Sequence, residues 1–272
     1  MKGSAGFAFK TALLASWSFA AMSTVAGAQA ACAGLPTQAQ LKAALVAAVS
    51  AETSGLNNHM WATIVNRDGV VCAVAFSGSD RSAQWPISRV VSAQKANTAN
   101  AVALDRGSFS NGSGQQTGLA LSTANLYSAT QPGSSLYGLQ HSNPVDTAVA
   151  YKGPASAWGG PNDPMVGGRI GGVNVFGGGL GLYNPDKKAV GGVGVSGDTA
   201  CADHNIAWRV RHELALDNLS GVGGVSGDAT RPDNIVFDIT PNPAGGPGTS
   251  AGGFGHPSCP NTAGSATLPV VR

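Results

Sequence analysis

The stretch that decides the fold is VNVFGGGLGLYNPDKKAVGGVGVSGDTACADHNIAWRVRHEL, residues 173–214, because strand periodicity gives way to helical periodicity within it. Residues 173–183 alternate apolar side chains with glycine, and residues 189–195 form a second run of the same kind. Asn-Pro-Asp at residues 184–186 is typical of a turn, so the two runs predict a hairpin. From residue 203 to residue 214 the apolar side chains recur at helical spacing, which predicts a helix.

Three successive glycines, Gly177, Gly178 and Gly179, lie inside the predicted hairpin. A residue without a Cβ lets another backbone, a flat ligand or a neighbouring subunit come close. The free N–H groups at the start of the following helix favour an anion or a carboxylate. This glycine corner is therefore a candidate binding surface, and the alternative is that glycine only supplies turns in a chain that holds 39 of them.

The predicted helix over residues 203–214 has two different faces. Asp203 falls with the apolar residues on the core face, whereas His204, Trp208 and Arg211 cluster on the opposite side. An imidazole, an indole and a guanidinium on one outer face suit recognition of a flat anionic ligand or a partner subunit. Alternatively, His204 is a structural histidine of the first helical turn.

Before residue 107, the same reasoning predicts a helix, a hairpin and a second helix. A helical pattern begins at Thr37, between a proline and a later glycine. Residues 60–65 and 70–76 are β-rich runs joined by a turn that ends in Asp-Gly. The second helix is predicted from Pro86 to about Leu104.

Polar residues interrupt the apolar stripe of this second predicted helix. Gln94, Lys95 and Thr98 fall on the face that also carries Ile87 and Val91. Burying a lysine without a partner is costly, so Lys95 should meet a carboxylate, a bound ligand or a subunit boundary. The alternative is a lysine stem along apolar surface with its ammonium group in water. A second stripe is uniformly small and suits close packing: Ser92, Ala96, Ala99 and Ala103.

The first thirty residues have the pattern of a signal peptide. Lys2 and Lys10 precede the apolar run 11–21, and Ala-Gln-Ala at residues 28–30 predicts cleavage after Ala30. The chain is therefore expected to be exported to the periplasm or the extracellular space. Later apolar runs are too short to predict a transmembrane segment in the mature chain.

Export gives the four cysteines a structural role. Cys32, Cys72, Cys201 and Cys259 form an even set in an oxidising compartment, which favours two disulfides. Of the three possible pairings we favour Cys32 with Cys72 and Cys201 with Cys259, because each ties a terminal segment to a core element. A zinc site is the weaker alternative, since no Cys-x-x-Cys spacing occurs.

Composition indicates one globular domain with peripheral segments. The chain has 272 residues, of which 43% are hydrophobic and 11% charged. Its 16 basic residues include the two leader lysines, so 14 basic and 14 acidic residues remain and no basic field for nucleic acid is left. We expect a domain over residues 31–240, a loop-rich insert at about 107–172 and a Pro/Gly-rich tail over 241–272. A short helix at 119–127 and an edge strand at 234–239 are also predicted.

Two enzyme motifs are present in incomplete form. Residues 192–197 match G-x-G-x-x-G, but they belong to a predicted hairpin and not to a parallel strand, which disfavours a dinucleotide site. Ser196 lies in a near match to a nucleophile elbow in which Asp198 stands where glycine is required. We therefore do not expect an enzyme, and a hydrolase is the least unlikely alternative.

Several motifs in combination resemble the GlcG/HbpS family of haem-binding proteins, which is related to the C-terminal domain of PduO. They are Ser88-Arg89 with QKANTA at residues 94–99, the glycines of GGVNVFGGG at 171–179, and GVGVSGD at 192–198 with Asp203 following. The match covers roughly residues 41–219. The long insert, the cysteines and the tail depart from the compact pattern of the family.

The resemblance implies a profilin-like α/β (α+β) domain, a mainly antiparallel sheet flanked by helices, and self-association into a homo-oligomer. It also implies binding of a small planar ligand, a haem or a corrinoid, near Lys95, Thr98 and the glycine corner. There Lys95 would pair with a propionate, and His204 would ligate or polarise the metal. The expected function is haem binding for sensing, scavenging or protection. The alternatives are a cofactor-free oligomeric interaction module and an enzyme of unrecognised chemistry.

Overall fold

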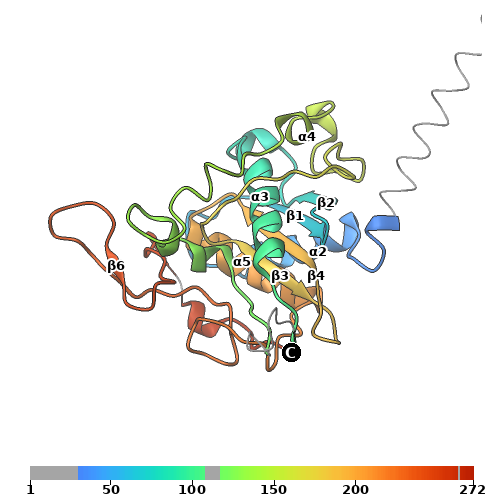
Figure 1. Ribbon diagram of the computed structural model, residues 1–272. Helices are drawn as coiled ribbons and strands as arrows, with labels where there is room; N and C mark the ends of the chain where they lie inside the picture. Colours follow the sequence, from blue (N-terminus) through green and yellow to red (C-terminus); the bar gives the residue numbers. More distant parts are fainter. Residues whose placement is uncertain (1–29, 108–116, 263) are drawn as a thin grey trace, which may run out of the picture.

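The computed structural model describes residues 30–107, 117–262 and 264–272, and it places a four-stranded sheet at the centre of the chain (Figure 1). The predicted leader, except Ala30, and residues 108–116 of the insert lie outside the described residues. The strands are β1 (Trp61–Asn66), β2 (Val71–Phe76), β3 (Gly179–Tyr183) and β4 (Ala189–Ser196). They lie in the order β2-β1-β4-β3, and every neighbouring pair is antiparallel. The expected fold class is therefore confirmed.

Helices cover both faces of the sheet. Helix α3 (Ser88–Val102) packs on one face, and α2 (Gln38–Ala51) and α5 (Ala200–Glu213) pack together on the other. Each face has an apolar core of its own, formed by Leu41, Leu45 and Trp208 on the α2/α5 side and by Val65, Val90 and Met165 on the α3 side. Among the described residues, no helix is both long and apolar enough to cross a membrane.

Close packing of α3 on β4 depends on glycine. A Cβ at Gly194 would lie 2.0 Å from the carbonyl oxygen of Ser92, and one at Gly192 would lie 2.2 Å from that of Ala96. No real side chain tolerates such distances, so only glycine lets the helix backbone approach the strand. The predicted close packing of the small stripe of α3 is confirmed, and the G-x-G-x-x-G run serves this contact in an antiparallel strand.

The predictions for the two other core helices and the first hairpin are confirmed to within a few residues. Helix α5 begins three residues earlier than predicted, since Thr199 is its N-cap and the Thr199 hydroxyl accepts a hydrogen bond from the N–H of Ala202 at 3.3 Å. Thr37 likewise caps α2, in a capping box with Gln40.

Three sequence predictions are wrong. The strand expected from residue 173 begins only at Gly179, because Gly178 before it adopts φ +116°, which is not a strand conformation. The helix expected at residues 119–127 is reduced to a 3-10 turn at Thr123–Leu126. Of the edge strand expected at residues 234–239, only Ile239 is in a strand, β5 (Ile239–Thr240), which pairs with β6 (Thr249–Ser250) outside the main sheet.

Long irregular segments surround the sheet, with the short helix α4 (Thr147–Ala150) in the insert, and the β5–β6 segment extends away from the core (Figure 1). Both disulfides form as predicted, Cys32 with Cys72 and Cys201 with Cys259. The second one fastens the C-terminal segment, by which we mean residues 233–262 and 264–272, to the first turn of α5, so the tail is attached to the core through Cys259.

Candidate functional site

A buried polar cluster lies between α3, β4 and α5. The ammonium group of Lys95 is 2.6 Å from a carboxylate oxygen of Asp203 and also donates to the carbonyl of Val195 at 3.1 Å. The other carboxylate oxygen of Asp203 accepts the N–H of Asp198 at 2.9 Å. Burial raises the pKa of Asp203 to about 6, although Lys95 beside it favours the carboxylate. Lys95 therefore meets a carboxylate, the first of the partners that the sequence predicted.

The glycine corner belongs to this polar cluster. A Cβ at Gly178 would lie 2.5 Å from the carbonyl oxygen of Val195 and 3.0 Å from the ammonium nitrogen of Lys95. A Cβ at Gly177 would lie 2.2 Å from the carbonyl oxygen of Ala200. Gly179 is as tightly enclosed, by Thr123 and the backbone of Lys95. The atoms that approach the three glycines are thus the chain's own.

Thr98 lies one helical turn from Lys95 and faces the segment before the glycine corner. Its hydroxyl donates to the carbonyl of Gln94 at 2.8 Å and accepts the N–H of Asn174 at 3.0 Å. Thr98 therefore holds Asn174, in the segment before the glycine corner, against α3.

His204 is fully buried beside Gly177 and is not protonated at neutral pH. Its Nε2 lies 3.1 Å from the side-chain oxygen of Asn234 and 3.2 Å from the N–H of Ile235. Its Nδ1 is buried and has no hydrogen-bond partner among the described residues. Burial lowers the pKa of His204 to about 4, so the imidazole is neutral. A neutral imidazole with an unpaired buried nitrogen is unusual, because such an atom loses its hydration without compensation.

The prediction that His204, Trp208 and Arg211 form an exposed face is wrong, since all three are fully buried. Arg211 forms a double hydrogen bond with Asp233, at 2.5 and 2.9 Å, and the indole N–H of Trp208 donates to the carbonyl of Pro269 at 2.9 Å. Helical periodicity separates two faces, but it does not reveal that a distant segment covers the second one.

Sequence reasoning missed His256, which lies next to the polar cluster. Its Nδ1 is 2.7 Å from the carbonyl oxygen of Pro257, and its Nε2 accepts a long hydrogen bond of 3.4 Å from the N–H of Gly177. Burial lowers its pKa to about 4. The signal was the predicted disulfide: Cys201 is three residues before His204 and Cys259 three residues after His256, so the disulfide brings both histidines to one place.

His256 also lines a cavity of about 390 Å³ in the C-terminal segment. The ring of Tyr127, from the insert, lies 5.3 Å from the imidazole of His256, centroid to centroid. Phe237 and Ile239 add apolar surface to the wall. The cavity thus offers a neutral imidazole, a phenol and an apolar lining beside the polar cluster.

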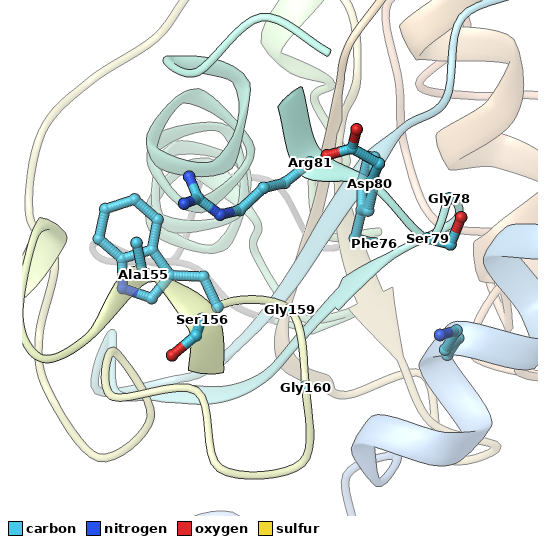
Figure 2. A pocket seen from close by; sticks show the side chains of 11 residues that line it. Phe76, Gly78, Ser79, Asp80, Arg81, Ala155, Ser156, Gly159 and Gly160 are labelled. Atoms are coloured by element: carbon cyan, nitrogen blue, oxygen red, sulfur yellow. The ribbon is translucent and has the colours of Figure 1, made fainter. Parts of the chain in front are cut away.

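A second cavity, of about 340 Å³, lies between the insert and the loop after β2 (Figure 2). Figure 2 shows Asp80 and Arg81 at its wall. The guanidinium of Arg81 lies 5.8 Å from the ring centroid of Trp158, and that of Arg89 lies 4.4 Å from it. The carboxylate of Asp80 accepts a hydrogen bond from the N–H of Ser82 in the same loop, and this bond lowers the pKa of Asp80. The remaining cations, Arg81 and Lys42, make this cavity suitable for an anionic group.

No protein-family model matches the chain, and no curated protein matches it. The solved structures that are similar to this chain include the following two. One is protein ORFY of Klebsiella pneumoniae, described by the family model DUF336, at 23% identity and a TM-score of 0.41 over 66% of this chain and 90% of that one. The other is PduOC, in a structure titled a complex with haem, at 23% identity and a TM-score of 0.41 over 64% of this chain and 88% of that one.

Proposed function

We propose that this chain is an exported binding protein for a planar tetrapyrrole, haem in the first instance, with residues 31–240 as the binding domain and residues 241–272 as its tail. The observation that carries the proposal is His204, a buried and neutral imidazole whose Nδ1 has no partner among the described residues. A neutral imidazole nitrogen is a standard ligand of haem iron.

The residue types around His204 fit the chemistry of the ligand. Lys95 supplies a cation for a propionate, and Thr98 supplies a hydroxyl one turn away. Gly177, Gly178 and Gly179 put bare backbone beside His204 and Lys95, where a flat ring needs the least obstruction. A bound haem would supply an iron centre that takes axial ligands and gives a strong Soret absorption.

Binding at the polar cluster requires a change of conformation, because the chain's own atoms fill the space at the glycine corner. Asn234, Ile235 and His256 cover His204 and Gly177. The segment that carries them is irregular and lies outside the main sheet, and the Arg211–Asp233 ion pair and the Cys201–Cys259 disulfide fasten it to α5. We infer that the ligand enters when this segment moves away from α5.

Two disulfides that tie the ends of the described chain to its core support export, since disulfides persist in oxidising compartments. A tetrapyrrole-binding protein in such a compartment would act in sensing, scavenging or protection. We also propose self-association, on the resemblance alone, with light scattering at micromolar concentration as its test. A strictly monomeric species would remove it.

Hemin titration of the purified chain, followed by the Soret band, tests the proposed ligand. His204→Ala should shift the Soret position or weaken binding, whereas His141→Ala, which removes an exposed histidine of the insert, should titrate like the parent. Lys95→Ala should be made together with Asp203→Ala, so that no unpaired buried charge remains, and should weaken binding by about 1–3 kcal/mol. Variants that fold and titrate like the parent would remove the polar cluster as the site.

The second candidate is a cofactor-free oligomeric interaction module. The observation that favours it is the glycine corner, where backbone and side-chain atoms of the chain itself make the closest approaches. This candidate predicts a folded oligomer that gives no Soret band with hemin, so titration and light scattering together distinguish the two functions.

A further inference from the structure

Three metal-ligating side chains meet where the C-terminal segment is fastened to α5. The sulfur atoms of Cys201 and Cys259 and a ring nitrogen of His256 all lie within 4.8 Å of one another. Among the described residues, this is the one group of three or more His, Cys, Asp or Glu side chains that could hold a metal ion. In the oxidised chain the two sulfur atoms are bonded to each other, so they hold no metal.

The surroundings of the disulfide favour thiolates once it is opened. Cys201 is the second residue of α5, and its N–H donates to the sulfur of Cys259 at 3.2 Å. A thiolate of Cys259 would therefore accept a hydrogen bond from the N-terminus of a helix, where a negative charge is stabilised. The Nδ1 of His256 donates to the carbonyl oxygen of Pro257 at 2.7 Å, so the lone pair of the imidazole is on Nε2, where it meets only a long hydrogen bond of 3.4 Å from Gly177.

We propose that opening of the Cys201–Cys259 disulfide creates a Cys₂His site for a soft or borderline divalent cation, Zn²⁺ in particular. The S–S bond breaks when a dithiol delivers two electrons and two protons, and the dithiol itself becomes a disulfide. The cation then binds both sulfur atoms as thiolates and releases the two thiol protons to solvent. Three protein ligands leave a fourth position for water or another small ligand, as in open zinc sites.

The cavity of about 390 Å³ gives this fourth position a place, because His256, Pro257 and Ser258 line it beside Cys259. The metal would also replace the disulfide as the link between the C-terminal segment and α5. The cover over His204 is thus held covalently in the oxidised chain and by coordination in the reduced one. This assigns the tail disulfide a redox-dependent role that is independent of tetrapyrrole binding.

The test uses Co²⁺ as the probe, because thiolate coordination of Co²⁺ gives a charge-transfer band in the near ultraviolet and a tetrahedral site gives visible bands. The Cys32→Ser/Cys72→Ser variant of the full chain leaves Cys201 and Cys259 as the only cysteines. It is reduced with a dithiol, freed of it under anaerobic conditions and titrated. We expect one Co²⁺ per reduced chain, displacement of Co²⁺ by Zn²⁺, and no band from the oxidised chain.

Two further variants identify the ligands. His256→Ala in the same background should weaken Co²⁺ binding at least tenfold and red-shift or diminish the visible bands, whereas His141→Ala should leave the titration unchanged. Removal of Cys201 and Cys259 in the parent chain should abolish stoichiometric binding. Absence of a stoichiometric thiolate band from the reduced chain, whether it is folded or not, overturns the proposal. A His256→Ala titration equal to that of the parent overturns the assignment of His256.

Discussion

The insert and the C-terminal segment are each fastened to the core by a buried arginine–aspartate pair, but only the C-terminal segment is also held by a disulfide. In the insert, Asp163 forms a buried ion pair with Arg89 of α3, and the indole of Trp158 lies 4.4 Å from the guanidinium. In the C-terminal segment, Asp233 pairs with Arg211 of α5 at 2.5 Å. The ring of Trp208, also in α5, lies 4.6 Å from that guanidinium. All four charged side chains are buried.

The difference is the disulfide Cys201–Cys259, which attaches the C-terminal segment to α5 a second time. This segment covers His204 and the glycine corner, whereas the insert segment held by Asp163 covers the apolar face of α3. An apolar face is held by the hydrophobic effect as well as by the ion pair. A cover over buried polar groups gains less from burial, so the covalent link carries a larger share of its stability.

The largest effect should follow from breaking either arginine pair. Arg211→Ala and Arg89→Ala each leave a buried aspartate without its partner, which should lower the free energy of unfolding by about 3–5 kcal/mol. Denaturant unfolding measures this, and Arg211→Met/Asp233→Leu is the matched control, expected to cost much less because no buried charge remains. Equal losses of unfolding free energy in the single and the double variant would show that an unpaired buried aspartate is not the cause.

Removal of the Cys201–Cys259 disulfide should affect the C-terminal segment and leave the insert in place. Cys201→Ser/Cys259→Ser opens a link between residues 58 apart in the sequence and should cost about 2–4 kcal/mol. Limited proteolysis should then cut the C-terminal segment first and leave the insert protected. Cys32→Ser/Cys72→Ser should cost a similar amount without exposing that segment. Equal protection of the C-terminal segment in both variants would show that the ion pair alone holds it.

Acid should loosen the C-terminal segment before the insert. Burial lowers the pKa of His204 and of His256 to about 4, below the ordinary value of 6.5, so the unfolded chain binds more protons between these values. Their stabilisation is present above pH 6.5 and is lost as the pH falls toward 4. The pKa of Asp203 is raised from 3.8 to about 6, so protonation of this carboxylate stabilises the folded chain below pH 6. It offsets only part of the loss, because two histidines act in the opposite direction.

The net loss between pH 7 and pH 5 should be about 2 kcal/mol. Hydrogen exchange at the two pH values would locate it, and a His204→Gln/His256→Gln variant should reverse the dependence and gain about 1 kcal/mol toward pH 5, because only the contribution of Asp203 remains. Faster exchange in the insert than around residues 233–257 at pH 5 would contradict this account.

Much of the core could be predicted from sequence because periodicity and turn chemistry act locally. Asp68-Gly69 ends the turn of the first hairpin, and the small stripe of α3 correctly indicated a close contact. The sequence showed that Lys95 needed a partner, which is Asp203, whereas Arg211 was predicted on an exposed face and is in fact buried against Asp233.

The cover over His204 could not be predicted, because irregular segments carry no period. The strand is shortened at Gly178, whose φ of +116° interrupts the extended backbone, and the alternation of apolar residues with glycine does not reveal that conformation. Cysteine pairing was the exception: the predicted Cys201–Cys259 disulfide correctly attached the tail to the core, although the place of His256 was not inferred from it.

The smallest effect concerns the place where the two regions touch. The hydroxyl of Ser128, in the insert, donates to the carbonyl oxygen of Gly255, in the C-terminal segment, at 2.6 Å. Ser128→Ala should therefore cost about 1 kcal/mol in the parent chain. In the Cys201→Ser/Cys259→Ser background the cost should fall toward zero, because a released segment no longer presents the carbonyl of Gly255.

Denaturant unfolding of the parent, both variants and their combination gives the coupling, which should exceed about 0.5 kcal/mol. Additive costs would mean that the C-terminal segment stays in place without its disulfide, and the ion pair of Arg211 would then be sufficient to hold it.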